Sequence, residues 1–328
     1  MQNHTSPKTV VISGATGLLG SSLLRLLVQA PDVCKIHCIA IRDMSKLAEF
    51  ASCPKVVLHK GDLSLPRCGL TEAETKSISA SADAIIHNGA DVSFLKTYHS
   101  LRSANVSSTK ALVQLASTRR IPLHFVSTAT AGKFNKSETL APESLARFPP
   151  HPDGGAGLAN GYAASKWASE IFLEKTSRQI GLPVFIHRPS AIMGDDAAED
   201  IMSNLLEYGS LIKALPDLSR WTGYVDLVSL ENVTEGIARS VLQATTGADS
   251  NSRVEYLHHA GDQIIPVQSI RELLSGEAGS GLESLPIGEW VDGAVRSGMN
   301  PLVGEFLRDA DAHGGLQVGQ KLLLSKEN

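Results

Sequence analysis

The sequence predicts an α/β fold in which helices cover both faces of a parallel β-sheet. Two observations predict it. Short, uniformly apolar and β-branched runs alternate with amphipathic helical patterns through the first half of the chain, and strands that are apolar throughout are typical of a parallel sheet buried on both faces. A glycine-rich turn also joins the first apolar run to the first helical pattern. Together they indicate a doubly wound sheet with crossover helices on both sides.

The individual elements follow from this alternation in chain order. The expected strands are Thr9 to Ser13, Lys35 to Ile41, Val56 to Lys60, Ala84 to Asn88, Leu123 to Ser127 and Val184 to His187. The expected helices are Leu18 to Gln29, Leu101 to Ser117 and Gly161 to Lys175. The segment from Lys133 to Ala159 is rich in proline and has no clear period, so we expect a surface loop there.

The pattern changes after Gly194. Helical stretches follow at Ile201 to Leu215, Ile270 to Leu274 and Glu289 to Ser297, with single strands near Val225 to Val228 and Val254 to His258. A chain of 328 residues is near the size at which one core stops growing. We therefore predict one domain over residues 1–194 and a smaller, mostly helical lobe over residues 195–328, part of which contributes to the same sheet.

Composition and charge exclude several classes of protein. The chain is 42% hydrophobic and carries 30 Lys and Arg against 34 Asp and Glu, so it lacks the basic balance of a nucleic-acid-binding protein. No apolar run is long enough to span a bilayer. Adjacent His258 and His259 point to opposite faces of a strand, and we expect no metal site. Because no CxxC pair is present, we expect reduced thiols and a cytoplasmic protein; the cysteines are Cys34, Cys38, Cys53 and Cys68.

A glycine motif, Gly14-Ala-Thr16-Gly17-Leu18-Leu-Gly20, connects the first strand to the first helix. The first glycine allows a tight turn, and the second lets the backbone approach a pyrophosphate at the helix N-terminus. The third allows close packing of the helix on the strand. The motif in this position predicts a Rossmann-type dinucleotide site.

The ends of the next strands favour NADPH over NADH. Arg42 stands where an acidic residue would grip a ribose 2′-hydroxyl, and a guanidinium suits a 2′-phosphate. The alternative is a solvated ion pair of Arg42 with Asp43. Asp62, next to Leu63, is placed to accept from the adenine amino group or is a turn aspartate. Small residues in Asn88-Gly89-Ala90 let the chain pass beneath the cofactor.

A phenol and an ammonium lie one helical turn apart. Tyr162 and Lys166 are four residues apart and share a helix face. A cation favours the phenolate, so we expect Lys166 to lower the Tyr162 pKa into a range that serves acid-base chemistry. Thr128 follows the strand Leu123 to Ser127 and would lie beside the tyrosine at the carboxyl edge of the sheet. The three groups can polarise a carbonyl oxygen and protonate it as hydride reaches the carbon.

These residues and several longer motifs resemble a known family. The glycine motif, Thr128 and Tyr162-x-x-x-Lys166 look like an extended short-chain dehydrogenase/reductase. The longer sequence motifs of the chain are similar to those of the thioester reductase (R) domains of nonribosomal peptide synthetases, in particular the terminal domains of fungal polyketide/peptide hybrids. The motifs that carry this likeness are His87-Asn-Gly-Ala90, His124-Phe-Val-Ser-Thr128, Gly181-Leu-Pro183, Arg188-Pro189, Trp221-x-Gly-Tyr-Val-Asp226 and Gly298-Met-Asn-Pro301. They extend over most of the chain.

The resemblance implies a catalytic set of Thr128, Tyr162 and Lys166. Ser108 and Ser190 depart from the family pattern, because glycine is usual at both positions; the first affects helix packing and the second the loop near the nicotinamide. The residues predicted to bind NADPH are Gly14, Thr16, Gly17, Leu18, Gly20, Arg42, Asp62, Leu63, Asn88, Gly89, Ala90, Asn105, Lys166, Pro189, Ser190 and Ile192.

The function that the resemblance implies is release of an acyl or peptidyl chain from a carrier protein. NADPH would reduce the phosphopantetheine thioester to an aldehyde, with or without a second reduction to the alcohol. Two alternatives stay open: a redox-inactive Dieckmann cyclase that releases a tetramic acid, and a non-catalytic nucleotide-binding scaffold. We expect a substrate cleft between the two parts of an excised synthetase domain, bordered by the Lys133 to Ala159 loop and the segment after Gly194.

Overall fold

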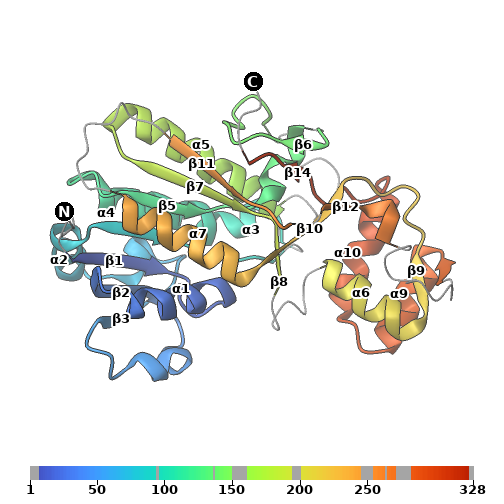
Figure 1. Ribbon diagram of the computed structural model, residues 1–328, viewed down its shortest axis with the longest axis horizontal. Helices are drawn as coiled ribbons and strands as arrows, with labels where there is room; N and C mark the ends of the chain where they lie inside the picture. Colours follow the sequence, from blue (N-terminus) through green and yellow to red (C-terminus); the bar gives the residue numbers. More distant parts are fainter. Residues whose placement is uncertain are drawn as a thin grey trace.

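The computed structural model describes residues 7–93, 96–135, 137–149, 161–193, 201–244, 254–262, 264–270 and 282–324. Its centre is a seven-stranded sheet with the order β11-β7-β5-β4-β1-β2-β3, in which every neighbouring pair is parallel (Figure 1). The predicted doubly wound α/β fold is confirmed. The strand order reverses between β1 and β4, where such sheets form their binding crevice. The strands are β1 (Lys8–Ser13), β2 (Val33–Ile41), β3 (Val56–Lys60), β4 (Ala84–His87), β5 (Leu123–Val126), β7 (Val184–Pro189) and β11 (Val254–His259).

Apolar side chains hold helices against both faces of this sheet. Helices α1 (Leu18–Gln29) and α7 (Leu230–Gln243) pack on one face. Helices α2 (Glu72–Ser81), α4 (Ser108–Ser117) and α5 (Gly161–Ile180) bury their apolar residues on the other. Residues Val10, Val11 and Ile12 of β1 are fully buried, which explains why this strand lacks the polar alternation of a sheet with one wet face.

A second core fills the smaller lobe beside the sheet (Figure 1). Helices α6 (Ile201–Ile212), α9 (Ile287–Arg296) and α10 (Pro301–Ala312) surround fully buried Trp221 and Trp290. Three small sheets complete the structure: β12 (Ile264–Pro266) with β10 (Tyr224–Ser229) and β8 (Ala191–Met193), β13 (Glu283–Leu285) with β9 (Ala214–Pro216), and β14 (Lys321–Leu322) with β6 (Thr139–Leu140). The short helical segments are α3 (Tyr98–Arg102), η1 (Met44–Phe50), η2 (Pro66–Gly69), η3 (Ser103–Ser107), η4 (Ala129–Asn135) and η6 (Val267–Ser269).

Two predicted helices differ from the structure. Between Leu101 and Ser117 the chain passes from α3 through the π-helical turn η3 into α4. The helix expected over Ile201 to Leu215 ends at Ile212, because Lys213 has a φ of 57° and the next residue begins β9. Residues 150–159 of the predicted loop, 194–200 after the predicted boundary and 271–274 of a predicted helix lie outside the described residues, and the domain division stays a prediction.

Two further findings concern the described ranges. No helix in them is long and apolar enough to cross a membrane. The four cysteines form no disulfide.

A buried ion pair fixes helix α5 against the sheet. The side chains of Glu170 on α5 and Arg188 on β7 are both 0% exposed, with Arg188 Nη2 2.7 Å from Glu170 Oε2 and Nε 3.1 Å from Oε1. The Ser127 hydroxyl donates to Glu170 Oε1 at 2.5 Å. The guanidinium also donates to the backbone carbonyl oxygens of Ala141 and Glu143, at 3.3 and 2.9 Å. The pair therefore connects α5, β5, β7 and the chain that precedes α5.

Breaking this pair should destabilise the protein strongly. We expect Arg188→Met to lower the free energy of unfolding by about 3–5 kcal/mol, because it leaves the Glu170 carboxylate buried and uncompensated. The matched control is Arg25→Met, which removes an ion pair with Glu49 whose side chains are 56% and 54% exposed. That change should cost roughly 1 kcal/mol or less. Equal losses for the two variants in urea titrations would contradict the assignment.

Candidate active site

Two glycines of the motif are required by packing within the protein. Gly14 has a φ of +75°, and a Cβ added there would lie 2.6 Å from the Gly89 backbone. A Cβ on Gly20 would lie 1.9 Å from the Gly14 carbonyl oxygen. Neither overlap can be relieved by a side-chain rotation. These positions hold β1, α1 and the end of β4 in close contact at the point where the strand order reverses.

Gly17 is different, because an added Cβ would not overlap with any described protein atom. It is exposed, its φ is −88°, and a Cβ would meet its nearest neighbour, the Gly14 carbonyl oxygen, at an ordinary 3.7 Å. Gly17 is the N-cap of the twelve-residue helix α1 and supplies no side-chain cap, so the first N–H groups of the helix are available. Exposed Thr16 and half-buried Leu18 flank it. This arrangement fits the pyrophosphate of a dinucleotide.

Arg42 and Asp62 face each other across the ends of β2 and β3. The Arg42 Nε atom lies 3.7 Å from Asp62 Oδ2, and the Arg42 side chain is 83% exposed. Asp62 Oδ1 accepts from the Ser64 hydroxyl and N–H, at 2.6 and 2.8 Å, and these bonds lower the Asp62 pKa. Asp62 is thus a turn aspartate that also pairs with Arg42. Asp43 instead caps η1 through Ser45, so the Arg42–Asp43 pair is not formed.

The residues after β4 form hydrogen bonds with the glycine turn and with the end of β1. Asn88 Nδ2 donates to the Gly14 carbonyl oxygen at 3.2 Å, and the Gly89 N–H donates to the Ser13 hydroxyl at 3.1 Å. A Cβ on Gly89 would lie 3.0 Å from Gly14 N and 3.1 Å from a methyl group of Leu63. Gly89, one of the small residues predicted to pass beneath a cofactor, is therefore also in tight contact with the glycine turn and with Leu63.

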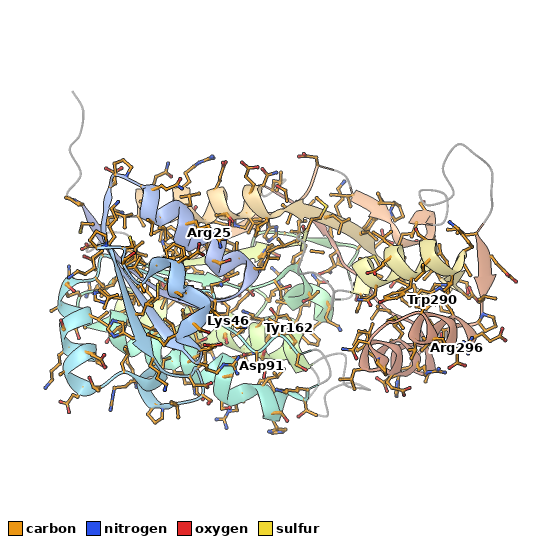
Figure 2. The ribbon with its side chains drawn as sticks, turned by 90° about the horizontal axis from the view of Figure 1, so that it is seen from below. Arg25, Lys46, Asp91, Tyr162, Trp290 and Arg296 are labelled. Atoms are coloured by element: carbon orange, nitrogen blue, oxygen red, sulfur yellow. The ribbon has the colours of Figure 1, made fainter. Side chains whose placement is uncertain are left out.

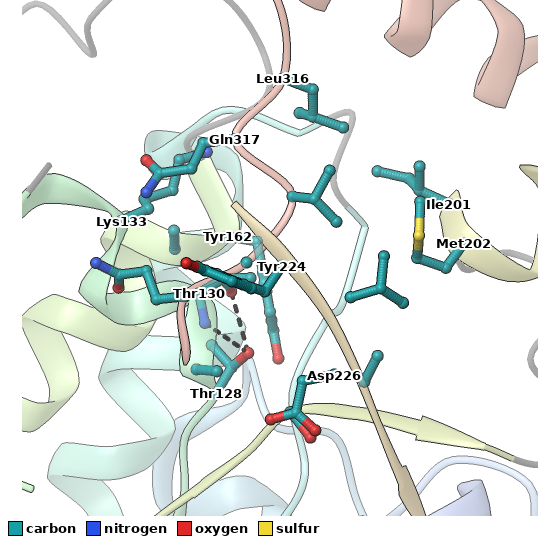
Figure 3. A pocket seen from close by; sticks show the side chains of 18 of the residues that line it. Thr128, Thr130, Lys133, Tyr162, Ile201, Met202, Tyr224, Asp226, Leu316 and Gln317 are labelled. Atoms are coloured by element: carbon teal, nitrogen blue, oxygen red, sulfur yellow. Dashed lines mark hydrogen bonds between the residues drawn. The ribbon is translucent and has the colours of Figure 1, made fainter. Parts of the chain in front are cut away.

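Thr128 and Tyr162 line one cavity of about 270 Å³ (Figure 3). Thr128 follows β5, and its hydroxyl lies 3.0 Å from that of Thr130. Tyr162 is in the first turn of α5, on the side of the sheet that faces the lobe with Trp290 (Figure 2). Lys166 lies one turn further along, 3% exposed, where its ammonium donates to the Val126 carbonyl oxygen at 2.6 Å. The structure thus brings the three predicted catalytic residues together.

The predicted lowering of the Tyr162 pKa is wrong for this structure. Burial raises the pKa of the phenol, because the phenolate would lose its hydration. Burial also lowers the pKa of Lys166 to about 8, against the opposing effect of Glu170. The Lys166 ammonium lies 5.8 Å from the centre of the Tyr162 ring and is hydrogen bonded elsewhere. Desolvation therefore outweighs the attraction on which the sequence argument depended.

The other predicted residues support the site from its edges. Asn105 is 3% exposed and donates to the Ser165 hydroxyl at 2.9 Å and the Asp91 carbonyl oxygen at 3.0 Å, which ties η3 to helix α5. Ser190 lines the cavity. Buried Pro189 ends β7, and half-buried Ile192 packs from β8 against the core around α1. The departure at Ser108 is accommodated, since its hydroxyl lies 3.1 Å from His87 Nε2.

The cavity lies partly where the sequence predicted a cleft, because Ile201 and Met202, in the segment after Gly194, line it. Sequence reasoning missed Phe306 and the segment from Leu316 to Gln320, which closes one side. Backbone hydrogen bonds hold this segment along β10, from Tyr224 N–H to Gly319 O and from Val318 N–H to Thr222 O. This segment is short and has no hydrophobic periodicity from which its place in the cavity wall could be predicted. Lys133, from the predicted loop, also lines the cavity, where burial lowers its pKa to about 8.

His258 and His259 each have a hydrogen-bond partner within the protein. His259 Nε2 lies 3.0 Å from His187 Nδ1, and His258 Nδ1 lies 2.8 Å from the Leu323 carbonyl oxygen. Burial lowers the pKa of both imidazoles. Within the described ranges no group of three or more His, Cys, Asp or Glu side chains is arranged to hold a metal ion.

Comparison with known proteins assigns the family. An NAD-binding family model, described as "Male sterility protein", matches residues 12–233. The chain belongs to this family. It is 59% identical over 323 residues to the Hybrid PKS-NRPS synthetase xenE of Xenoacremonium sinensis and 58% identical over 329 residues to the Hybrid PKS-NRPS synthetase pydA of an Acremonium species. These matches cover 98% and 100% of this chain but only 8% of each synthetase.

A solved structure agrees with this family. The terminal R domain from the myxalamid PKS-NRPS biosynthetic pathway is 28% identical, with a TM-score of 0.76 over 97% of this chain and 83% of that one. The reductase domain of PhqB from Penicillium fellutanum, at 21% identity and a TM-score of 0.66, covers 96% of this chain and 86% of its own and shares the fold. The resemblance to the terminal R domains of PKS-NRPS hybrids, drawn from the sequence motifs, is confirmed.

Mutation can distinguish a glycine that is needed for cofactor binding, Gly17, from one that is needed for packing, Gly20. We expect Gly17→Ala to fold normally but to weaken NADPH binding roughly tenfold or more, because a methyl group would stand where the pyrophosphate approaches. Gly20→Ala should instead lower stability by about 1–3 kcal/mol or more through its overlap with Gly14. Thermal unfolding and cofactor titration measure the two effects. Unchanged NADPH affinity in a folded Gly17→Ala protein would remove the α1 N-terminus from the site.

Proposed function

We propose that this chain is a cytosolic, NADPH-dependent thioester reductase that releases an acyl or peptidyl chain from a carrier protein as an aldehyde. The observation that carries the proposal is the juxtaposition of Thr128 and Tyr162 in a cavity between the sheet and the smaller lobe. The uncapped N-terminus of α1 at the same edge of the sheet supports a dinucleotide partner. The 8% coverage of the related synthetases supports a domain that receives its substrate from a larger assembly.

NADPH, when bound, supplies the hydride that reduces the thioester carbonyl. The residues of the chain then act on the carbonyl oxygen: the hydroxyls of Thr128 and Tyr162 donate hydrogen bonds as negative charge develops on it. Lys166 would hold the nicotinamide ribose. Collapse of the tetrahedral adduct breaks the C–S bond and releases the pantetheine thiol. One thioester, one NADPH and one proton thus give one aldehyde, one thiol and one NADP⁺.

The raised pKa of Tyr162 suits this role. A phenol that stays protonated at neutral pH is a hydrogen-bond donor and an acid, as an oxyanion requires. The same property makes Tyr162 a poor general base, whereas a Dieckmann cyclisation needs a base that removes an α-proton. Half-buried Tyr162 is therefore better suited to donate a hydrogen bond than to act as the base of a cyclisation.

Arg42 should select NADPH over NADH. Its mostly exposed guanidinium stands at the strand end where the adenosine ribose lies in such folds, and a 2′-phosphate can replace the weak contact with Asp62. We expect wild-type protein to bind NADPH at least tenfold more tightly, since tenfold needs only about 1.4 kcal/mol, and Arg42→Ala to bind both cofactors alike. Titration of each cofactor measures this. Equal wild-type affinities would place Arg42 outside the site.

Loss of the Tyr162 hydroxyl should remove activity without unfolding the protein. Tyr162→Phe keeps the ring, so we expect an unchanged melting temperature and a fall in turnover of roughly 10²-fold or more. Thr128→Ala should do less. NADPH absorbance and product mass, with an acyl-pantetheine substrate, give the readout. A cyclised product formed without NADPH, with no aldehyde or alcohol when NADPH is present, would instead establish the Dieckmann alternative.

A further inference from the structure

Residues 316–323, which we call the strap, form one wall of the cavity that contains Thr128 and Tyr162. The first five residues of the strap all line this cavity. Figure 3 shows Leu316 and Gln317 above Thr128 in that view. The reaction proposed above gives the strap no role.

The strap connects the smaller lobe to the segment that follows Thr128. At its start, Leu316 belongs to the core of the smaller lobe. At its end, Lys321 and Leu322 form β14, which pairs with β6. Leu322 also shares an apolar cluster with Ala129, the first residue of η4, which directly follows Thr128. The strap therefore spans the cavity from one side to the other.

Backbone contacts fix one edge of the strap against β10. Gly223, which precedes β10, has a φ of +94°, and a Cβ added there would lie 2.2 Å from the Gly319 carbonyl oxygen. A Cβ on Gly319 would lie 2.8 Å from the Tyr224 carbonyl oxygen. The Tyr224 N–H donates to the Gly319 carbonyl oxygen at 3.0 Å. Glycine at both positions thus lets the two chains lie in direct backbone contact.

A buried side chain connects the strap to η4. Gln320 is 3% exposed, and its Nε2 atom donates to Asn135 Oδ1 at 2.5 Å and to the Ser137 carbonyl oxygen at 2.6 Å. Because both partners are acceptors, they orient the NH₂ group of the amide towards them. Asn135 Oδ1 also accepts from the Ser137 N–H at 2.8 Å, so the local turn sets its position. Gln320 therefore joins the cavity wall to the end of the segment that begins after Thr128.

We propose that the strap is the substrate-side wall of the active site and that Gln320 is its positioning residue, which sets the affinity for the thioester but not for the dinucleotide. The inference rests on the proposed reductase function for the identity of this ligand. Gly17 and Arg42, the expected contacts of the pyrophosphate and the adenosine ribose, do not line this cavity. A displaced strap should therefore leave most cofactor contacts in place.

The test uses the full chain and three probes: NADPH, octanoyl-pantetheine thioester, and the amide analogue in which nitrogen replaces the thioester sulfur and which resists hydride reduction. Gln320→Met keeps the size of the side chain and removes both donors. Gln268→Met is the matched control, because it removes an amide that donates to the Trp221 carbonyl oxygen outside this cavity. Asn135→Ala is a milder second variant that removes one of the two acceptors.

We expect Gln320→Met to raise the KM of the thioester and the Kd of the amide analogue by about tenfold or more, with kcat and the Kd of NADPH within roughly twofold of wild type. Asn135→Ala should raise the same two constants by less, and the double variant should add little to Gln320→Met alone. Gln268→Met should leave all four constants unchanged.

An unchanged Kd of the analogue in Gln320→Met overturns the inference, as does an equal loss of NADPH affinity or the absence of analogue binding to wild-type protein. If Gln320→Met does not fold, the same readouts on Asn135→Ala decide. Wild-type protein that binds the analogue but oxidises no NADPH with the thioester would instead refute the reductase function.

Discussion

Glu170 and Arg188 form the contact on which the geometry of the active site depends. Two fully buried charges are expensive to dehydrate, and they are tolerated here because both groups are hydrogen bonded on several sides. Glu170 is one turn from Lys166 and two turns from Tyr162 on the same helix, and its partner Ser127 directly precedes Thr128. The pair therefore sets the position of α5 relative to the ends of β5 and β7.

Desolvation of Tyr162 and Lys166 then sets the protonation states of these two side chains. Removal of water raises the pKa of Tyr162, which keeps the phenol a donor, and it lowers the pKa of Lys166 towards neutrality.

Sequence reasoning predicted the fold, because uniformly apolar strands and the glycine turn are local signals. It did not predict the buried ion pair of Glu170, because its partner Arg188 is 18 positions away. In the sequence, Glu170 cannot be distinguished from an exposed acidic residue on a helix. It also missed the segment from Leu316 to Gln320, which is placed by backbone bonds to β10. The Tyr162 pKa was predicted in the wrong direction because desolvation is a property of the tertiary structure.

The central claim is that the cavity catalyses hydride transfer to a thioester carbonyl. NADPH deuterated at the transferring C4 position, incubated with the protein and a carrier-bound acyl or peptidyl thioester, tests it through the mass of the released product. The account predicts an aldehyde that carries one deuterium on its aldehyde carbon, which was the thioester carbonyl carbon. This aldehyde should appear in step with NADPH oxidation. A released product without deuterium, formed equally well when the cofactor is left out, would contradict it.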